Sequence, residues 1–174
     1  MNNIIITKAT LNDLDQLQKI GRQTFYETFA SSNGAENMSH YLEESFSTPK
    51  LTAELRDKHA EIYFARQNNE VIGYLKLNEG PSQTEQQNGK ALEIERIYVL
   101  KEFHGKAVGQ MLYDKAVQIA RQKKVDYIWL GVWEENPRAI SFYKKNGFTA
   151  FGKHTFMLGT DAQIDIMMKL DLNP

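Results

Sequence analysis

Residues 92–119 read LEIERIYVLKEFHGKAVGQMLYDKAVQI and carry three structural signals in one segment. The first eight residues alternate β-forming and charged side chains, which predicts a strand over 92–99. Apolar residues then recur at three- and four-residue spacing from Leu112 to Ala120, which predicts a helix with one buried face. The turn over 104–109, HGKAVG, joins this strand to this helix.

This turn predicts an anion site. The first N–H groups of a helix have no intrahelical partner and lie at the positive end of its dipole, where phosphate commonly binds. Lys101 and Lys106 add positive charge. A purely structural turn is the alternative, since glycine-containing turns also occur where a chain only reverses direction. The turn matches neither the GxxxxGK[ST] nor the GxGxxG phosphate motif.

Length and composition narrow the classes of function. With 174 residues, 41% of them hydrophobic, we expect a single domain over 1–174. The net charge of -1 provides no basic field, so we expect no nucleic-acid partner. The absence of cysteine excludes disulfides and a catalytic thiol, and the four histidines lack metal-ligand spacing, so we expect no metal. Without a long apolar run, we expect a cytoplasmic protein with no membrane partner.

The rest of the chain alternates between the two periodicities. Further strands are predicted over 4–7, 61–66, 71–77, 125–132, 148–152 and 164–170, and further helices over 11–25, 36–46, from Pro49 through Leu55, and from Pro137 to Lys145. Asn68 and Asn69 predict a tight hairpin, residues 80–89 a polar loop without core-facing residues, and 153–163 another loop. This order predicts an α+β fold, an α/β/α sandwich whose mixed, mostly antiparallel sheet is flanked by helices.

The order of elements, the turn over 104–109 and the segment 136–148, NPRAISFYKKNGF, together resemble the GNAT superfamily of acetyl-CoA-dependent N-acetyltransferases. Segments 36–46, 92–99 and 129–148 look most like its bacterial spermidine/spermine-acetylating members. The resemblance implies the GNAT-like acyl-CoA N-acyltransferase fold, acetyl-CoA as co-substrate, and direct acetyl transfer to a primary amine, first of all a polyamine. A protein, peptide or other small amine as acceptor and a low-turnover CoA-binding regulator are the alternatives. A homodimer is also common in such folds.

The resemblance also implies which residues bind the cofactor. Backbone N–H groups of 104–109 would hold the pyrophosphate of CoA. The full set of implied contacts is Ile97, Tyr98, Val99, His104, Gly105, Lys106, Ala107, Val108, Gly109, Gln110, Asn136, Arg138, Tyr143 and Lys145. Two residues depart from the family pattern: His104 replaces Gln or Arg, and Ala107 replaces the first glycine. A Cβ at position 107 disfavours positive φ, so weaker cofactor binding is a possible consequence.

Three residues are candidates for catalysis. The resemblance assigns Tyr143 as the general acid that protonates the departing thiolate, although by itself it reads as a core aromatic. Glu93 and Glu95 are two residues apart on a strand and therefore share one face. A carboxylate in an apolar strand is costly unless it is solvated, paired or functional. Either glutamate could accept the proton of the amine, and an ion pair with Arg96 is the structural alternative.

The first helices mix carboxylates with aromatic residues. This combination suits a polyamine through ion pairing and cation–π contact, although it also describes an ordinary amphipathic helix pair. From it we expect Glu27 or Glu43 to bind the acceptor amine.

Overall fold

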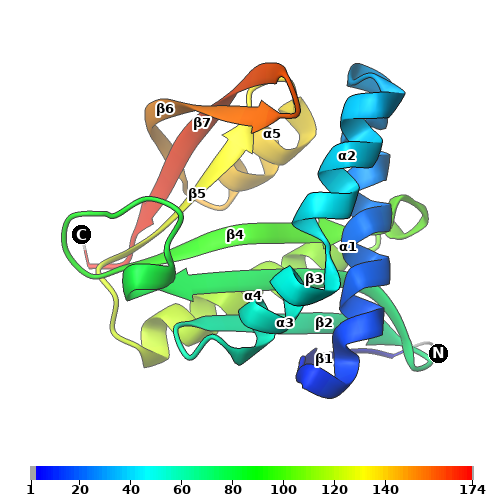
Figure 1. The fold of residues 1–174 in the computed structure, drawn as a ribbon. Coiled ribbons are helices and arrows are strands. Elements are labelled where there is room, and N and C mark those ends of the chain that lie inside the picture. Colours follow the sequence, from blue (N-terminus) through cyan, green and yellow to red (C-terminus); the bar gives the residue numbers. More distant parts are fainter. Residues whose placement is uncertain (1–2, 174) are drawn as a thin grey trace.

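The computed structural model describes residues 3–173, which form a seven-stranded sheet between two sets of helices (Figure 1). The strand order is β1-β2-β3-β4-β5-β7-β6, and every neighbouring pair is antiparallel except β4 and β5. The strands are β1 Ile4–Lys8, β2 Ala60–Gln67, β3 Glu70–Glu79, β4 Ala91–Val99, β5 Tyr127–Trp133, β6 Thr149–Leu158 and β7 Asp161–Asp171. The predicted mixed, mostly antiparallel sheet is therefore confirmed.

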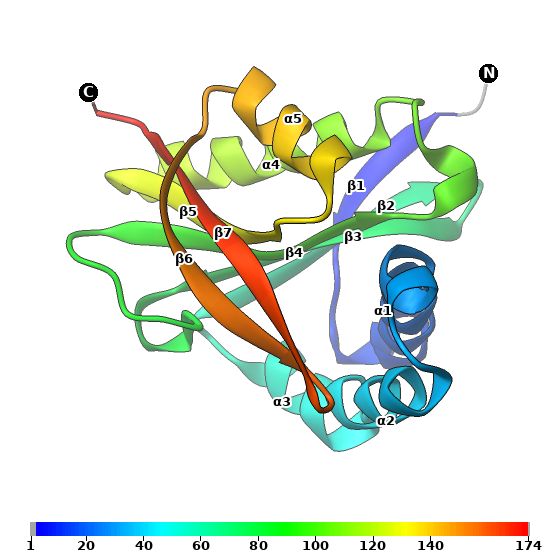
Figure 2. The ribbon, with the colours of Figure 1, turned by 90° about the horizontal axis from the view of Figure 1, so that it is seen from above.

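Helices cover both faces of the sheet, as predicted (Figure 2). One face carries α1 Leu14–Phe29, α2 Ala35–Ser45 and α3 Thr48–Arg56, and the other carries α4 Val108–Gln122 and α5 Pro137–Lys145. Short 3-10 helices lie between the larger elements: η1 Leu11–Asp13, η2 Ala30–Ser32, η3 Gly80–Ser82 and η4 Lys101–Phe103. Local sequence sets several of these boundaries. The Ser47 hydroxyl caps α3 and the Asn136 side chain caps α5, each just before a proline in the first turn.

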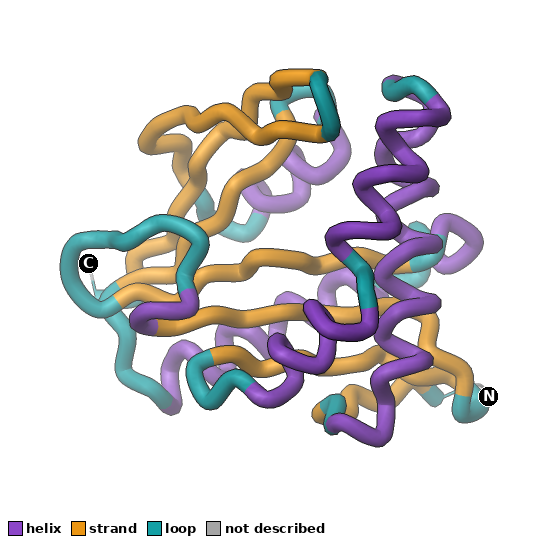
Figure 3. The backbone as a smooth tube through the Cα atoms, viewed as in Figure 1, coloured by secondary structure: helices purple, strands orange, loops and turns teal. Residues whose placement is uncertain are grey.

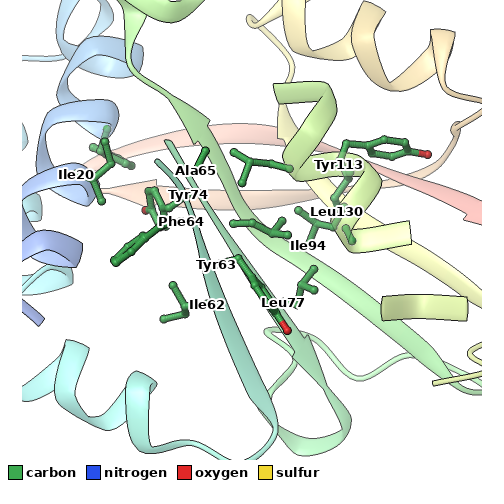
Figure 4. Packing of buried hydrophobic residues seen from close by; sticks show 14 of the residues in the cluster. Ile20, Ile62, Tyr63, Phe64, Ala65, Tyr74, Leu77, Ile94, Tyr113 and Leu130 are labelled. Atoms are coloured by element: carbon green, nitrogen blue, oxygen red, sulfur yellow. The ribbon is translucent and has the colours of Figure 1, made fainter. Parts of the chain in front are cut away.

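The core lies on both sides of the sheet because alternate strand residues point to opposite faces (Figure 4). On β2, Phe64 is fully buried on the side of Ile20 from α1. Its neighbour Tyr63 points to the other face, where the Lys115 Nζ of α4 lies 5.3 Å from its ring centroid. The predicted hairpin between β2 and β3 is confirmed, with Asn68 and Asn69 both at positive φ.

The sheet opens at its centre. β4 pairs with β5 over only three positions, ending at Glu93 and Trp129, and β5 then turns away from β4 (Figure 3). β4 also contains a bulge, because Lys76 of β3 pairs with Arg96 and Leu77 pairs with Ile94, leaving Glu95 without a partner. Bulges redirect side chains and interrupt pairing, and they are frequent beside active sites.

The C-terminal strands are longer than predicted. β6 continues to Leu158 and β7 begins at Asp161, so the loop predicted over 153–163 is wrong. The two strands form one hairpin that turns at Gly159, whose φ is +62°. β6 is an edge strand with mostly exposed residues, and the apolar alternation that reveals a half-buried strand is therefore weak in it.

Candidate active site

A cleft of about 1000 Å³ lies where β4 and β5 separate. Its wall includes β4, the start of α4, β5, α5, α1 and the β6–β7 hairpin. Of the residues predicted for the site, those that line it are Glu27, Glu93, Glu95, Ile97, Tyr98, Val99, His104, Gly105, Ala107, Val108, Gly109, Gln110, Asn136, Arg138, Tyr143 and Lys145. The splayed strands thus bring the strand, the turn and the α5 segment together.

Two predicted residues do not line the cleft. Lys106 places its ammonium 5.2 Å from the ring centroid of Phe103. Glu43 is exposed on α2, so the prediction that it lines the acceptor cleft is not met. The reason is helical geometry: Tyr41 of the same helix lines the cleft, and a residue two positions along points about 200° away from it.

The turn before α4 leaves the helix N-terminus open. Within residues 3–173 no side chain caps α4, and the N–H groups of its first turn have no intrahelical acceptor. The N-cap residue is Ala107, which has φ +64° and ψ +11°, in the left-handed region. The chain therefore forces this conformation on a residue with a Cβ, at a cost of about 1 kcal/mol relative to glycine. These N–H groups, together with Arg138 and Lys145 in the same cleft, make this end of the cleft suited to phosphate.

Glu93 is a buried carboxylate that can accept one more hydrogen bond. Only 3% of the residue is exposed. Its Oε1 accepts hydrogen bonds from Asn78 Nδ2 at 3.1 Å and from the Thr84 backbone N–H at 2.8 Å, and its Oε2 accepts from the Thr84 hydroxyl. Burial raises the pKa of Glu93 above its ordinary value, although these hydrogen bonds oppose the shift. Oε2 retains a free lone pair that can accept a proton.

Thr84 comes from the segment predicted to be a polar loop without core-facing residues, and none of residues 80–89 is buried. Two of its polar side chains nevertheless contact buried groups of the sheet. Besides the two bonds from Thr84 to Glu93, Gln83 Oε1 accepts from the fully buried Trp129 Nε1 at 2.8 Å. These contacts could not be predicted from local sequence, because they depend on how the loop folds back onto β4 and β5.

Glu95 lies in a different environment. Its carboxylate forms ion pairs with the Lys76 ammonium and, at 4.0 Å, with the Arg96 guanidinium. Glu54 contacts the same two cations, at 2.8 Å and 3.1 Å. Burial disfavours ionisation of Glu95, but Arg96 and Lys76 outweigh it and hold the pKa of Glu95 below its ordinary value. Of the two candidate bases, Glu95 fits the ion-pair alternative and Glu93 is the better proton acceptor.

Tyr143 lies on the face of α5 that borders the cleft. The residue is 6% exposed and packs between Phe142 and Phe148, with ring centroids 5.4 Å and 5.5 Å away. Burial, together with nearby Tyr113, raises the pKa of the Tyr143 hydroxyl, which is therefore protonated at neutral pH. It can act as a proton donor within the cleft. Asn136, at the start of the same helix, accepts from the Ala139 N–H at 3.2 Å and so caps α5.

The part of the cleft beside β6 and β7 contains residues that the sequence did not single out. His154 lies between two carboxylates, with Nδ1 2.9 Å from Glu85 Oε1 and Nε2 3.3 Å from Asp165 Oδ2. His154 and Asp165 line the cleft and lie over Gly131, where a Cβ would come within 3.1 Å of the imidazole. Aromatic rings complete this region, namely Phe29, Tyr41, Trp133 and Phe156. This acidic, aromatic region is suited to a cationic group.

Glu27 lines the cleft from α1, as predicted for one of the two acidic residues. Its Oε1 accepts the N–H of Lys101 at 3.1 Å, at the start of the η4 segment that leads to the turn before α4. The Glu27 carboxylate is thus already paired with the main chain at the end of β4. Two further findings concern residues 3–173 alone. Among them, no three His, Cys, Asp or Glu side chains are grouped for a metal ion, and no helix has the length and apolarity to span a membrane.

The fold and sequence match known acetyltransferases. The Acetyltransferase (GNAT) family matches residues 19–148. An uncharacterized N-acetyltransferase of Lactobacillus delbrueckii subsp. lactis is 37% identical over 97% of this chain and 98% of its own. The spermidine N(1)-acetyltransferase of Thermoplasma acidophilum is 27% identical over 84% of this chain and 88% of its own. The crystal structure of PaiA N-acetyltransferase from the same organism, in complex with coenzyme A, superposes with a TM-score of 0.79 at 24% identity, covering 97% of this chain and 99% of that one.

These identities correct one expectation. The likeness to polyamine-acetylating proteins is distant, at 27% and 24% identity, and the 37% identical Lactobacillus relative has no stated acceptor. The family-level resemblance is confirmed, whereas a close resemblance to the polyamine-acetylating members is not.

Proposed function

Because the chain belongs to the GNAT family of acetyltransferases, we propose that it transfers acetyl from acetyl-CoA directly to a primary amine, with a polyamine as the preferred acceptor. One observation carries the proposal: a single cleft is lined by the open N-terminus of α4, the proton acceptor Glu93 and the proton donor Tyr143. The CoA-bound structural neighbour supports acetyl-CoA as the co-substrate. The lack of cysteine excludes an acetyl-thioester intermediate on the protein, which agrees with direct transfer.

The cofactor lies along β4 and the turn before α4. Beyond Glu93, β4 pairs with no strand of residues 3–173 on the side of β5, so its main-chain N–H and C=O groups can pair with the extended pantetheine, as with an added strand; the Val99 carbonyl already accepts from His104. Ile97 and Val99 line this edge. The α4 N-terminus, with Arg138 and Lys145, binds the phosphates.

Glu93 and Tyr143 handle the protons of the reaction. An alkylamine is almost fully protonated at neutral pH and must lose a proton before it attacks the thioester. Glu93 Oε2 takes that proton, directly or through a water molecule, and its raised pKa brings it closer to the operating pH. The Tyr143 hydroxyl donates a proton to the sulfur as the carbon–sulfur bond breaks.

The acceptor extends from Glu93 toward the acidic, aromatic region beside β6 and β7. Asp165 contacts a second ammonium group, and the rings of Tyr41 and Phe156 pack against the alkyl chain. These contacts favour a diamine or polyamine over a monoamine. Of the two acidic residues predicted to bind the acceptor, Glu27 also lines the cleft and Glu43 does not. The distant spermidine N(1)-acetyltransferase relative supports the same class.

Thiol release from acetyl-CoA tests the proposal with a panel of spermidine, spermine, putrescine, propylamine, a lysine peptide and an aminoglycoside. We expect rapid release with the polyamines and slow release with propylamine. Asp165→Asn should raise KM for spermidine about tenfold and leave that for propylamine unchanged, because only the polyamine carries a second charge. Glu43→Gln is the matched control, since it removes an exposed carboxylate outside the cleft. Release with the lysine peptide alone would overturn the polyamine assignment.

A CoA-binding regulator with little turnover is the second candidate, favoured by the strained Ala107 in the cofactor turn. Calorimetry separates the two. Tight acetyl-CoA binding with no thiol release from any amine would indicate the regulator, whereas release with any amine indicates the enzyme.

A further inference from the structure

The imidazole of His104 connects the end of β4 to the first turn of α5. Its Nε2 lies 2.9 Å from the Val99 carbonyl oxygen, and its Nδ1 lies 2.8 Å from Arg138 Nη1. An arginine has donors and no acceptor, so Nδ1 must accept from Arg138. A carbonyl only accepts, so Nε2 must carry the hydrogen. Both contacts therefore exist only with the neutral, Nε2–H form of the ring.

This arrangement holds Arg138 where its other donors are free. Arg138 is exposed on α5 and forms no ion pair with a carboxylate within residues 3–173. A guanidinium has five N–H groups, and the bond to His104 uses one. The remaining donors border the same cleft as Gly105, Ala107 and Lys145, beside the open N-terminus of α4.

We propose that His104 is a positioning residue that holds Arg138 against a phosphate group of CoA. The proposal rests on the CoA binding proposed above. A long, exposed arginine side chain loses conformational freedom when it binds a ligand, and a contact that orders it beforehand lowers that cost. His104 provides such a contact, anchored at its other ring nitrogen to the rigid end of β4.

A double-mutant cycle on CoA affinity, measured by calorimetry, tests the proposal. His104→Ala should weaken CoA binding about three- to tenfold through lost preorganisation. Arg138→Ala should weaken it more, and adding His104→Ala to that variant should have no further effect. His104→Gln should retain part of the affinity, because an amide also supplies one donor and one acceptor. The matched control is Lys144→Ala, an exposed cation on α5 outside the cleft.

The second measurement is the affinity of the same variants for pantetheine, which lacks the phosphates. Arg138→Ala and Lys144→Ala should not change its affinity, and His104→Ala, which frees the Val99 carbonyl, should not weaken it as it weakens that of CoA. Two results would overturn the proposal. One is an equal loss of affinity for pantetheine and for CoA; the other is a double variant whose loss of CoA affinity equals the product of the two single-variant losses. Wild-type protein that binds no CoA would overturn the proposed function as well.

Nitrogen-15 NMR of the His104 ring tests the geometry independently of any ligand. The spectrum of the free protein should show the Nε2–H tautomer, and Arg138→Ala should weaken that preference. A predominant Nδ1–H ring in the wild-type protein would contradict the arrangement.

Discussion

Ala107 carries a Cβ, yet its surroundings hold its backbone in an unfavourable conformation. Its φ of +64° is imposed by the turn from η4 into α4, and Gly105 in the same turn has φ +78°. We expect Ala107→Gly to raise the free energy of unfolding by about 0.5–1 kcal/mol, because glycine adopts this region without strain but is more flexible in the unfolded chain. Urea unfolding of the wild type and of Ala107→Gly would measure this difference in the free energy of unfolding.

Gly105→Ala is the matched reverse substitution. No atom lies within 4 Å of a Cβ at that position, so the substitution adds conformational strain without a clash. It should lower the free energy of unfolding by about 1 kcal/mol. An Ala107→Gly variant less stable than the wild type would contradict the assignment of strain. The sequence indicated that a Cβ at 107 would oppose positive φ, but not that the fold imposes this φ.

Glu93 should make stability depend on pH in a direction opposite to most carboxylates. Its pKa in the folded protein is raised above the ordinary 4.5, so the folded state holds its proton more tightly than the unfolded state. The resulting stabilisation is fully present below pH 4.5 and is lost as the pH rises through the folded-state pKa. We expect this loss to disappear in Glu93→Gln, whose amide oxygen can still accept the N–H bonds from Asn78 and Thr84.

Urea unfolding of the two proteins at a series of pH values would measure this difference. The free energy of the wild type relative to Glu93→Gln should fall with increasing pH. A rise would mean that the hydrogen bonds outweigh burial. The sequence marked Glu93 as a candidate base, but it could not rank Glu93 above Glu95, because Thr84 and Lys76 approach from distant parts of the chain.

At the scale of elements, the bulge in β4 depends on a buried network of charges. Lys76 neutralises both Glu54 and Glu95, and its side chain is 8% exposed. Lys76→Met should lower the free energy of unfolding by about 3 kcal/mol, because two buried carboxylates then share Arg96 as their one remaining cation within residues 3–173. The control is Lys123→Met, whose side chain is 29% exposed and pairs with Glu61 and Glu79. It should cost less than about 1 kcal/mol.

Chemical denaturation of both variants compares the two networks directly. Similar losses would mean that the Lys76 network is as well solvated as a surface pair. The bulge itself could not be predicted from the sequence, because the alternation over 92–99 reads as a regular strand. By contrast, Asn68-Asn69 and Asn136-Pro137 predicted their turn and helix start correctly, since their conformational preferences are local.

At the scale of the whole molecule, the order of elements was predictable and the opening of the sheet was not. Periodicity identifies the strand over 92–99 and the helix that follows it, because each buries one face. It contains no information on how far β4 and β5 remain paired. Beyond Trp129, β5 continues beside β7 alone, with which it pairs from Tyr127 to Trp133. The cleft, and with it the acidic, aromatic region, lies where this pairing carries β5 away from β4.

The two proposed proton-transfer groups line the cleft from different elements, with Glu93 on β4 and Tyr143 on α5. Each group serves a different step, so we expect Tyr143→Phe and Glu93→Gln each to lower kcat by about 100-fold or more. Neither should weaken CoA binding by calorimetry, since neither change removes a group that contacts the phosphates.

The pH profiles of the two variants should differ. Glu93→Gln should lose the rise of kcat/KM with pH that its carboxylate produces, while Tyr143→Phe should retain it. Full activity in Tyr143→Phe would assign the proton donation to water or to another group.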